Sequence, residues 1–200
     1  LLEESFFSKE DLDEIAKQQL IIRELFESVT KDITVEESQV QEFFNENKDY
    51  IVMMKVAHIL VAAREGDATE EEAAAAEQIA KDLIKRLDDG EDFADLAKKY
   101  SDDPGSAQLG GELDYFFTKY DQNFVPEFVQ GSYELKVGEY SNEPVKSMHG
   151  FHIIKALDKI ESFDKFKDEL EMRVLEQEKG IAFEEYFQKL RDKAKIKNNL

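Results

Sequence analysis

Apolar residues recur at helical spacing near the N-terminus of the chain. Ser8 followed by Asp11 is a helix-start signal, and the apolar residues that come next are three or four positions apart. This pattern predicts a helix over about residues 9–29. Thr34 and Glu37 form a second capping box ahead of another apolar stripe, which predicts a shorter helix that ends near position 47.

The C-terminal segment has the pattern of one long helix that begins after Ser162. Gly180 interrupts it, and a glycine inside a helix costs about 1 kcal/mol relative to alanine, so we expect a weak or bent point there. None of the three end helices can bury its apolar stripe alone. We therefore expect residues 1–50 and 158–200 to form one discontinuous helical domain, with residues 51–157 inserted as a second domain.

The central segment reads as a mixture of strands and helices. Residues 53–62 include the β-branched Val56, Ile59 and Val61 and are almost uncharged, which predicts a strand buried on both faces. Residues 151–157 predict a second strand. The fold class expected from this order is α+β. The elements expected between the two strands are a helix from Thr69 to Gly90, a helix over Phe93–Tyr100, a loop at 101–106, a short strand at Leu113–Phe117, a helix over Glu127–Gln130 that starts at Pro126, and an extended piece at 138–144.

Composition removes several classes of function. The chain of 200 residues carries 26 Lys and Arg against 46 Asp and Glu, and its net charge of −20 repels nucleic acid, so we expect no nucleic-acid partner. It has no cysteine, which excludes thiol catalysis and disulfides. No run of eighteen apolar residues exists, so no membrane span is expected. Because the chain starts with Leu1, we interpret it as a mature or trimmed piece that a lipid or signal anchor could precede.

All three histidines lie on or beside the two predicted core strands. If these strands pair, His58 and His152 come together, and a buried imidazole needs a partner. A structural hydrogen-bonded pair is one interpretation. A zinc site that includes His149 is the other, although residues three apart on a strand point to opposite faces.

Seven motifs in a fixed order resemble the parvulin-type peptidyl-prolyl isomerases over about residues 54–157. They are AHILV, FADLA, YSDD, GGEL, FVPEF, GEYS and GFHII. The flanking helices, and the closing segment from Leu190 to Lys197, are more loosely similar to the split chaperone domain of bacterial extracytoplasmic foldases of the PrsA and SurA type. The resemblance implies a four-stranded, mainly antiparallel sheet surrounded by helices.

The resemblance also implies a set of site residues. His58 and His152 match the paired histidines of the family, Ser147 matches a hydroxyl residue of their network, and Asp103 stands where other members have cysteine or aspartate. His149 departs from the family pattern, and we expect it to be an exposed residue at the rim. The residues that match the proline pocket are Leu113, Phe124 and Phe128, for which plain core packing is the alternative.

The implied chemistry is rotation about an X-Pro bond. The barrier of about 20 kcal/mol comes from lost amide resonance, and no bond is made or broken, so neither a cofactor nor a metal is expected. Asp103 could polarise the histidines or repel the turning carbonyl. Family members that select phosphoserine or phosphothreonine need a basic cluster after the first strand, whereas residues 62–72 hold one arginine among five acids, so phospho-specificity is not expected.

We therefore predict a peptidyl-prolyl isomerase that assists the folding of secreted or envelope proteins outside the cytoplasm. Its substrates would be unfolded or partly folded polypeptides that contain proline. The alternative is a holdase-type chaperone in which the central domain is a weakly active or inactive binding surface. The unpaired helical arm of residues 1–50 also suggests an arm-exchanged homodimer.

Overall fold

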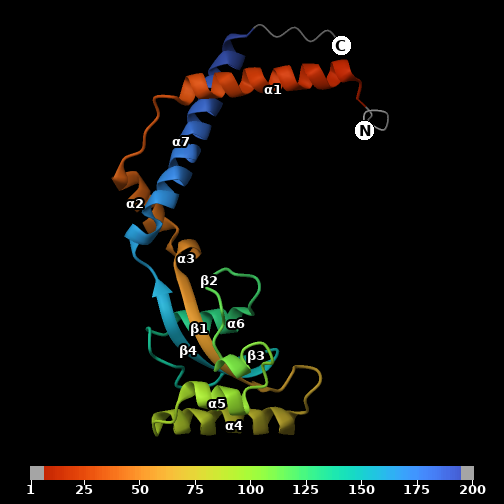
Figure 1. Ribbon diagram of the computed structural model, residues 1–200, viewed down its shortest axis with the longest axis vertical. Helices are drawn as coiled ribbons and strands as arrows, with labels where there is room; N and C mark the ends of the chain where they lie inside the picture. Colours follow the sequence, from red (N-terminus) through yellow and green to blue (C-terminus); the bar gives the residue numbers. More distant parts are fainter. Residues whose placement is uncertain (1–6, 195–200) are drawn as a thin grey trace. The chain divides into compact units, whose positions relative to one another are not determined.

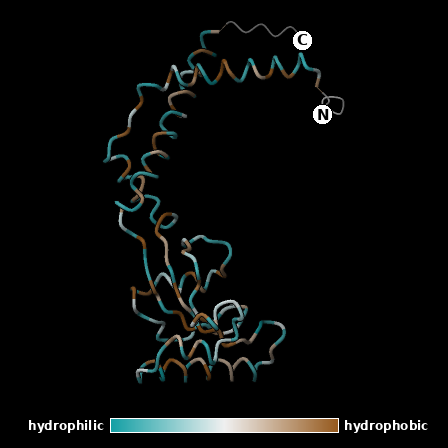
Figure 2. Tube along the Cα trace, in the orientation of Figure 1, coloured by the Kyte–Doolittle hydropathy of each residue, from teal (hydrophilic) through white to brown (hydrophobic). Residues whose placement is uncertain are grey.

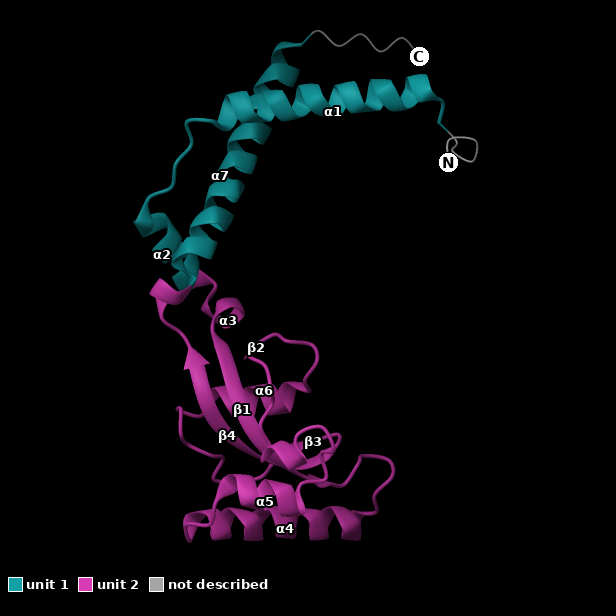
Figure 3. Cartoon of the chain, in the orientation of Figure 1, with its two compact units in different colours: residues 1–45, 166–200 teal, residues 46–165 magenta. Residues whose placement is uncertain are grey.

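The computed structural model describes residues 7–194, and its internal contacts divide the chain into two compact units. Figure 3 shows the units in two colours: one comprises residues 46–165, and the other comprises residues 1–45 with 166–200. The unit made of residues 1–45 and 166–200 is therefore discontinuous in sequence. Positions 195–197 of the closing segment that resembles the foldases lie outside the described residues.

The discontinuous unit is helical. It contains α1 (Lys9–Thr30), most of α2 (Glu37–Glu46) and most of α7 (Phe163–Lys193). Phe44 of α2 stacks on Phe166 of α7 with ring centroids 6.1 Å apart, and Phe26 of α1 meets Phe183 edge to face at 5.2 Å. The predicted capping box of Ser8 and Asp11 is present at the start of α1.

Helix α1 leaves much of its apolar surface open. Thr30 is its only buried residue, and Figure 2 shows apolar and polar positions alternating along the helix. Leu12, Ile15 and Ile22 are exposed on the side of the helix that also carries Phe26. Only the C-terminal end of the apolar face of α1 is therefore packed, where Phe26 contacts Phe183 of α7.

One expectation for the helical unit was wrong. Thr34 does not start α2, because the helix begins at Glu37 and the Glu36 amide instead donates to the side chain of Gln39 at 2.8 Å. The long α7 is a single helix, as predicted, and continues through Gly180, where a methyl group would meet open space.

The unit of residues 46–165 is built on a four-stranded antiparallel sheet with the strand order β2-β1-β4-β3. Its long central strands are β1 (Met53–Ala62) and β4 (Gly150–Ile160), and the short edges are β2 (Phe117–Thr118) and β3 (Val145–Ser147). Figure 1 shows these strands together with the helices of the unit. The helices are α3 (Lys48–Ile51), α4 (Glu70–Asp88), α5 (Phe93–Tyr100), the 3₁₀ turn η1 (Ala107–Leu109) and α6 (Pro126–Tyr133).

Both faces of the central strands are buried, as predicted from their composition. Because side chains alternate across a strand, odd-numbered residues such as Ile59 and Ile153 pack with α4 and α5. Even-numbered residues such as Val56 and Ile154 pack with α6 and Phe117. His58 and His152 are also even-numbered, so the register of the strands places both on the α6 face.

Several element boundaries differ from the prediction. The strand expected at Leu113–Phe117 is reduced to β2. The chain meets β1 at Glu112 and Leu113, bends at positions 114 and 115, and pairs with β1 again at Phe117 and Thr118. The extended piece at 138–144 makes one bridge, from Tyr140 to Lys155, and the paired strand β3 comes directly after it.

Gly111 fixes the backbone beside His58. Its φ is +82°, its carbonyl accepts from the His58 amide at 2.8 Å, and a methyl group on it would lie 2.3 Å from the His58 carbonyl oxygen. Only glycine fits this approach without displacing the strand.

We expect Gly111→Ala to lower the free energy of unfolding by about 2–4 kcal/mol, because it combines a left-handed backbone with a backbone clash. Gly138→Ala is the matched control, since Gly138 has a φ of +91° with nothing within 4 Å, and about 1 kcal/mol is expected from the backbone alone. Urea denaturation followed by circular dichroism measures both values. Equal losses in the two variants would show that the approach to His58 imposes no constraint.

Candidate active site

A chain of hydrogen bonds links four side chains on the α6 face of the sheet. Nε2 of His58 lies 2.9 Å from Oδ2 of Asp103, and Nδ1 of His58 lies 3.2 Å from Nδ1 of His152. Nε2 of His152 lies 2.7 Å from Oγ of Ser147. Both rings are buried, so each ring nitrogen is satisfied by a protein group.

The loop after α5 holds Asp103 as an anion. Its carboxylate accepts from the amides of Gly105 and Ser106 at 3.2 and 3.1 Å, and from the Ser106 hydroxyl. Partial burial opposes ionisation, but the hydrogen bonds from Ser106 and His58 outweigh it and lower the pKa of Asp103. Ser106 is itself fully buried, which makes this turn a rigid support.

The Asp103 carboxylate determines which atom donates and which accepts in each hydrogen bond of this chain. Because Asp103 only accepts, Nε2 of His58 carries the proton and Nδ1 of His58 is the acceptor. Nδ1 of His152 must then donate, which leaves Nε2 of His152 to accept from the Ser147 hydroxyl. The His149 amide donates to the same hydroxyl oxygen at 3.1 Å, which agrees with this direction.

Both imidazoles are neutral in this arrangement. Burial lowers the pKa of His58, although Asp103 partly offsets the effect. Burial also lowers the pKa of His152, and the neighbouring His58 and His149 add to the shift. The pair therefore acts as a fixed dipolar unit at neutral pH.

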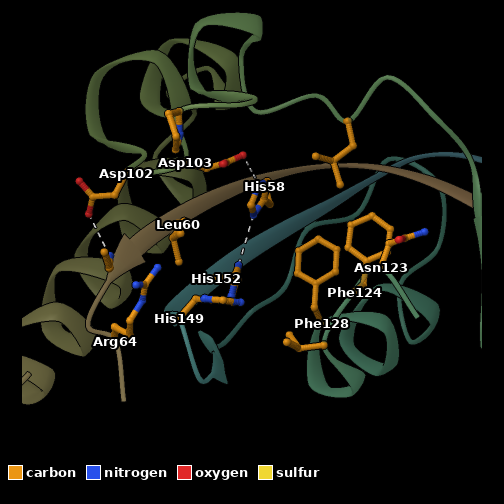
Figure 4. A pocket seen from close by; sticks show the side chains of 14 residues that line it. His58, Leu60, Arg64, Asp102, Asp103, Asn123, Phe124, Phe128, His149 and His152 are labelled. Carbon is orange, nitrogen blue, oxygen red and sulfur yellow. Dashed lines mark hydrogen bonds and ion pairs between the residues drawn. The ribbon is translucent and has the colours of Figure 1, made fainter. Parts of the chain in front are cut away.

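A cavity of about 530 Å³ opens beside the histidines. Phe124 and Phe128 form one wall with nearly parallel rings, whose centroids are 5.4 Å apart. The Phe128 ring stands edge to face against both histidines, at 5.3 Å from His58 and 5.2 Å from His152. Figure 4 shows the two phenyl rings side by side, across from the line of hydrogen bonds.

The structure brings together most of the residues predicted for the site. His58, Asp103, Leu113, Phe124, Phe128 and His152 all line the cavity. Ser147 does not line it and lies behind His152. His149 also lines the cavity and is exposed. Among residues 7–194, no three His, Cys, Asp or Glu side chains are arranged to hold a metal ion.

Sequence reasoning missed residues that support or surround these groups. Ser106 lies in the loop that composition predicts, and no motif marks its hydrogen bonds to Asp103. Ser101 was also missed: its hydroxyl accepts from the Leu60 amide at 3.1 Å and ties the loop to β1. Arg64 and Asn123 line the cavity, and no motif identified them.

Comparison with known proteins agrees with this geometry. The sequence profile described as the PPIC-type PPIASE domain matches residues 42–160. The chain therefore belongs to the PPIC-type, or parvulin, family of peptidyl-prolyl isomerases. The predicted family and the α+β fold are both confirmed.

The similar proteins are foldases and chaperones. The chain is 36% identical to the foldase protein PrsA of Clostridium botulinum strain Langeland over 98% of its own length and 56% of the relative. It is 34% identical to PrsA of Caldanaerobacter subterraneus over 97% of its length and 58% of that protein. A solved SurA-like chaperone structure from Campylobacter jejuni matches with a TM-score of 0.50 and 28% identity, over 96% of this chain and 74% of that one. The chain thus spans somewhat more than half the length of these PrsA relatives, and none of its described helices is long and apolar enough to cross a membrane.

The buried histidines predict how stability depends on pH. Their pKa values are lowered on folding, so below about pH 6.5 the unfolded chain binds protons that the folded chain does not. Stability is therefore expected to fall as the pH drops from 7 to 5, by up to about 1.4 kcal/mol per pH unit for each such histidine. Urea denaturation at several pH values measures this slope.

His152→Asn should reduce the slope, because one of the two buried imidazoles is removed. His149→Ala should reduce the slope less than His152→Asn does, since this ring is exposed to solvent and only adds to the pKa shift of His152. A slope that is the same in wild type and His152→Asn would contradict the neutral pair.

Proposed function

We propose that this chain catalyses cis–trans isomerisation of X-Pro bonds in unfolded or partly folded polypeptides. The observation that carries the proposal is the apolar cavity walled by Phe124 and Phe128 directly against the neutral pair of His58 and His152. Such a cavity has the shape and chemistry to hold a proline ring next to fixed polar groups. The PrsA relatives are named foldases, which supports a polypeptide substrate.

The proposed catalysis needs no proton transfer. A planar amide is more polar than a twisted one, because resonance places charge on its oxygen and nitrogen. Holding the X-Pro bond against the apolar wall of Phe124 and Phe128 therefore favours the twisted form, which is the transition state. Both nitrogens of each histidine are already used within the network, so the rings offer a fixed, preorganised wall.

Asp103 is proposed to act through His58. Its carboxylate already accepts from His58 and from Ser106, whose own side chain is buried. These bonds support a role in fixing the tautomer and angle of the histidine pair, in preference to repulsion of the substrate carbonyl.

We also propose that the site does not select phosphorylated residues. Among the described residues that line the cavity, Arg64 is the only lysine or arginine, and Asp102 and Asp103 line the same cavity. One guanidinium beside two carboxylates is a poor site for a dianion.

Exchange NMR on a proline tetrapeptide tests the activity and the role of Asp103. Asp103→Asn is expected to lower kcat/KM about 10- to 100-fold, equal to about 1.4–2.7 kcal/mol of barrier, because an amide cannot accept all the hydrogen bonds that this carboxylate accepts. Asp89→Asn, which removes an exposed charge at the end of α4, is the control and should stay within twofold of wild type.

Wild-type exchange rates equal to those in buffer would refute the isomerase proposal. Equal activity in Asp103→Asn and wild type would refute the role of the aspartate alone. The same assay with phosphoserine in place of serine before proline should show no gain.

The exposed stripe of α1 supports a second function in which the helical unit holds unfolded clients. Leu12, Ile15 and Ile22 continue the face that Phe26 packs on α7, and this apolar surface is open within its own unit. The similarity to a SurA-like chaperone is consistent with such binding. A second copy could cover the same stripe, so the arm-exchanged homodimer also remains a proposal.

Ile15→Asp combined with Ile22→Asp tests both uses of α1. The double variant should lose suppression of aggregation of an unfolded client, while its isomerase rate on a tetrapeptide stays within twofold of wild type. Lys17→Asp is the control on the same helix, at an exposed polar position. Sedimentation of wild type and variant then shows whether a dimer depends on the stripe, and a wild type that neither suppresses aggregation nor dimerises would exclude both uses.

The proposed location is outside the cytoplasm. The support is again the relatives: the Campylobacter jejuni study describes one of its two SurA-like chaperones as periplasmic. Secreted and envelope proteins would then be the clients.

A further inference from the structure

A second cavity, of about 770 Å³, lies against α6 beside the first. Its buried and half-buried lining residues are Phe124, Val129, Tyr133 and Asp121, and the first three give it an apolar floor. Exposed polar residues of α6 and of the segment that precedes it stand around its edge, among them Gln130 and Glu134. The isomerase mechanism makes no use of this space.

The two cavities share one wall. Phe124 lines both of them, and its ring is held in place by Phe128 at 5.4 Å and Phe117 at 4.6 Å. An extended polypeptide advances about 3.3 Å per residue. A chain whose proline occupies the first cavity can therefore reach the second with a side chain only a few residues away.

The walls of the second cavity are aromatic and preorganised. The hydroxyl of Tyr133 lies 2.7 Å from the Val52 carbonyl and 3.0 Å from the Phe117 carbonyl, so its polar end is already satisfied and its ring faces the space. Tyr120 is half exposed but is stacked on Tyr50 with centroids 4.3 Å apart. Fixed aromatic rings favour an aromatic occupant, which packs against them edge to face or offset.

The edge of the cavity carries uncompensated negative charge. Lys119 is ion-paired with Asp49 at 2.8 Å. The carboxylate of Asp121 accepts from the Asn123 amide groups, and the carboxylate of Glu134 accepts from the Gln130 side chain, so both are bonded to neutral donors. A basic residue next to the aromatic one is therefore favoured over an acidic one.

We propose that this second cavity is a substrate subsite that binds an aromatic side chain one to three residues from the isomerised proline. The subsite prefers clients in which a lysine or arginine is adjacent to that aromatic residue. The inference rests on the proposed isomerase function and names the sequence context that the function selects.

The probes are seven-residue peptides with one central proline in an alanine and glycine background. Phenylalanine is placed one, two or three positions to either side of the proline, with lysine or glutamate beside it, and an alanine peptide is the reference. Exchange NMR gives kcat/KM for each. At one placement we expect kcat/KM to rise about 5- to 20-fold over the alanine peptide, and lysine to exceed glutamate about threefold.

Two variants locate the effect. Gln130→Trp fills the cavity and should bring the ratio of phenylalanine to alanine peptides close to 1. Glu134→Lys should cancel or invert the preference for lysine over glutamate, and this surface charge change keeps the test open if the tryptophan variant does not fold. Asp89→Lys, the same charge change away from α6, should preserve both ratios.

The outcomes separate the subsite from the isomerase. If the alanine peptide is accelerated but no phenylalanine placement gives a gain above twofold, the subsite is overturned and the isomerase stands. If no peptide is accelerated, the proposed function itself fails. The subsite is also overturned if the gain persists in Gln130→Trp, or if the amide signals of Tyr120 and Tyr133 shift on dilution without peptide, because a second copy would then occupy the cavity.

Discussion

The antiparallel pairing of β1 with β4 is the constraint on which the site depends. Its register sets Leu60 opposite His152 and His58 opposite Ile154, so the two histidines are diagonal neighbours on one face. A slip of one residue would turn one of them toward α4 and α5. Burial on both faces makes such a slip costly, because each strand would place its core residues against the wrong neighbours.

The loop after α5 determines which nitrogens of the two histidines carry protons. Its Asp102 amide donates to the Leu60 carbonyl at 2.8 Å and its Ser101 hydroxyl accepts from the Leu60 amide, so the loop is tied to β1 two residues from His58. The next residue, Asp103, then accepts from His58. Sheet pairing thus fixes where the rings lie, and the loop fixes which of their nitrogens carry protons.

The sequence predicted the parts of the fold that local pattern determines. The long strands and the helix over Phe93–Tyr100 follow from composition and capping residues, and the pairing of His58 with His152 follows from two adjacent strands. The start of α2 was missed because the side-chain contact at the helix start joins Gln39 to the Glu36 amide, and Thr34 takes no part in it. The short β2 could not be found locally, since it depends on pairing with the distant strand β1. Ser106 was missed although its hydrogen bonds to Asp103 span only three residues.

The closed chain of hydrogen bonds from Asp103 to Ser147 has a thermodynamic consequence. No atom in it is left to be consumed or regenerated when an X-Pro bond turns. In the proposed function, such a site lowers the barrier equally in both directions and leaves the ratio of cis to trans in a free substrate unchanged. Under that proposal, a net shift toward one isomer comes from the substrate polypeptide, because its own folding takes the native isomer out of the cis–trans equilibrium.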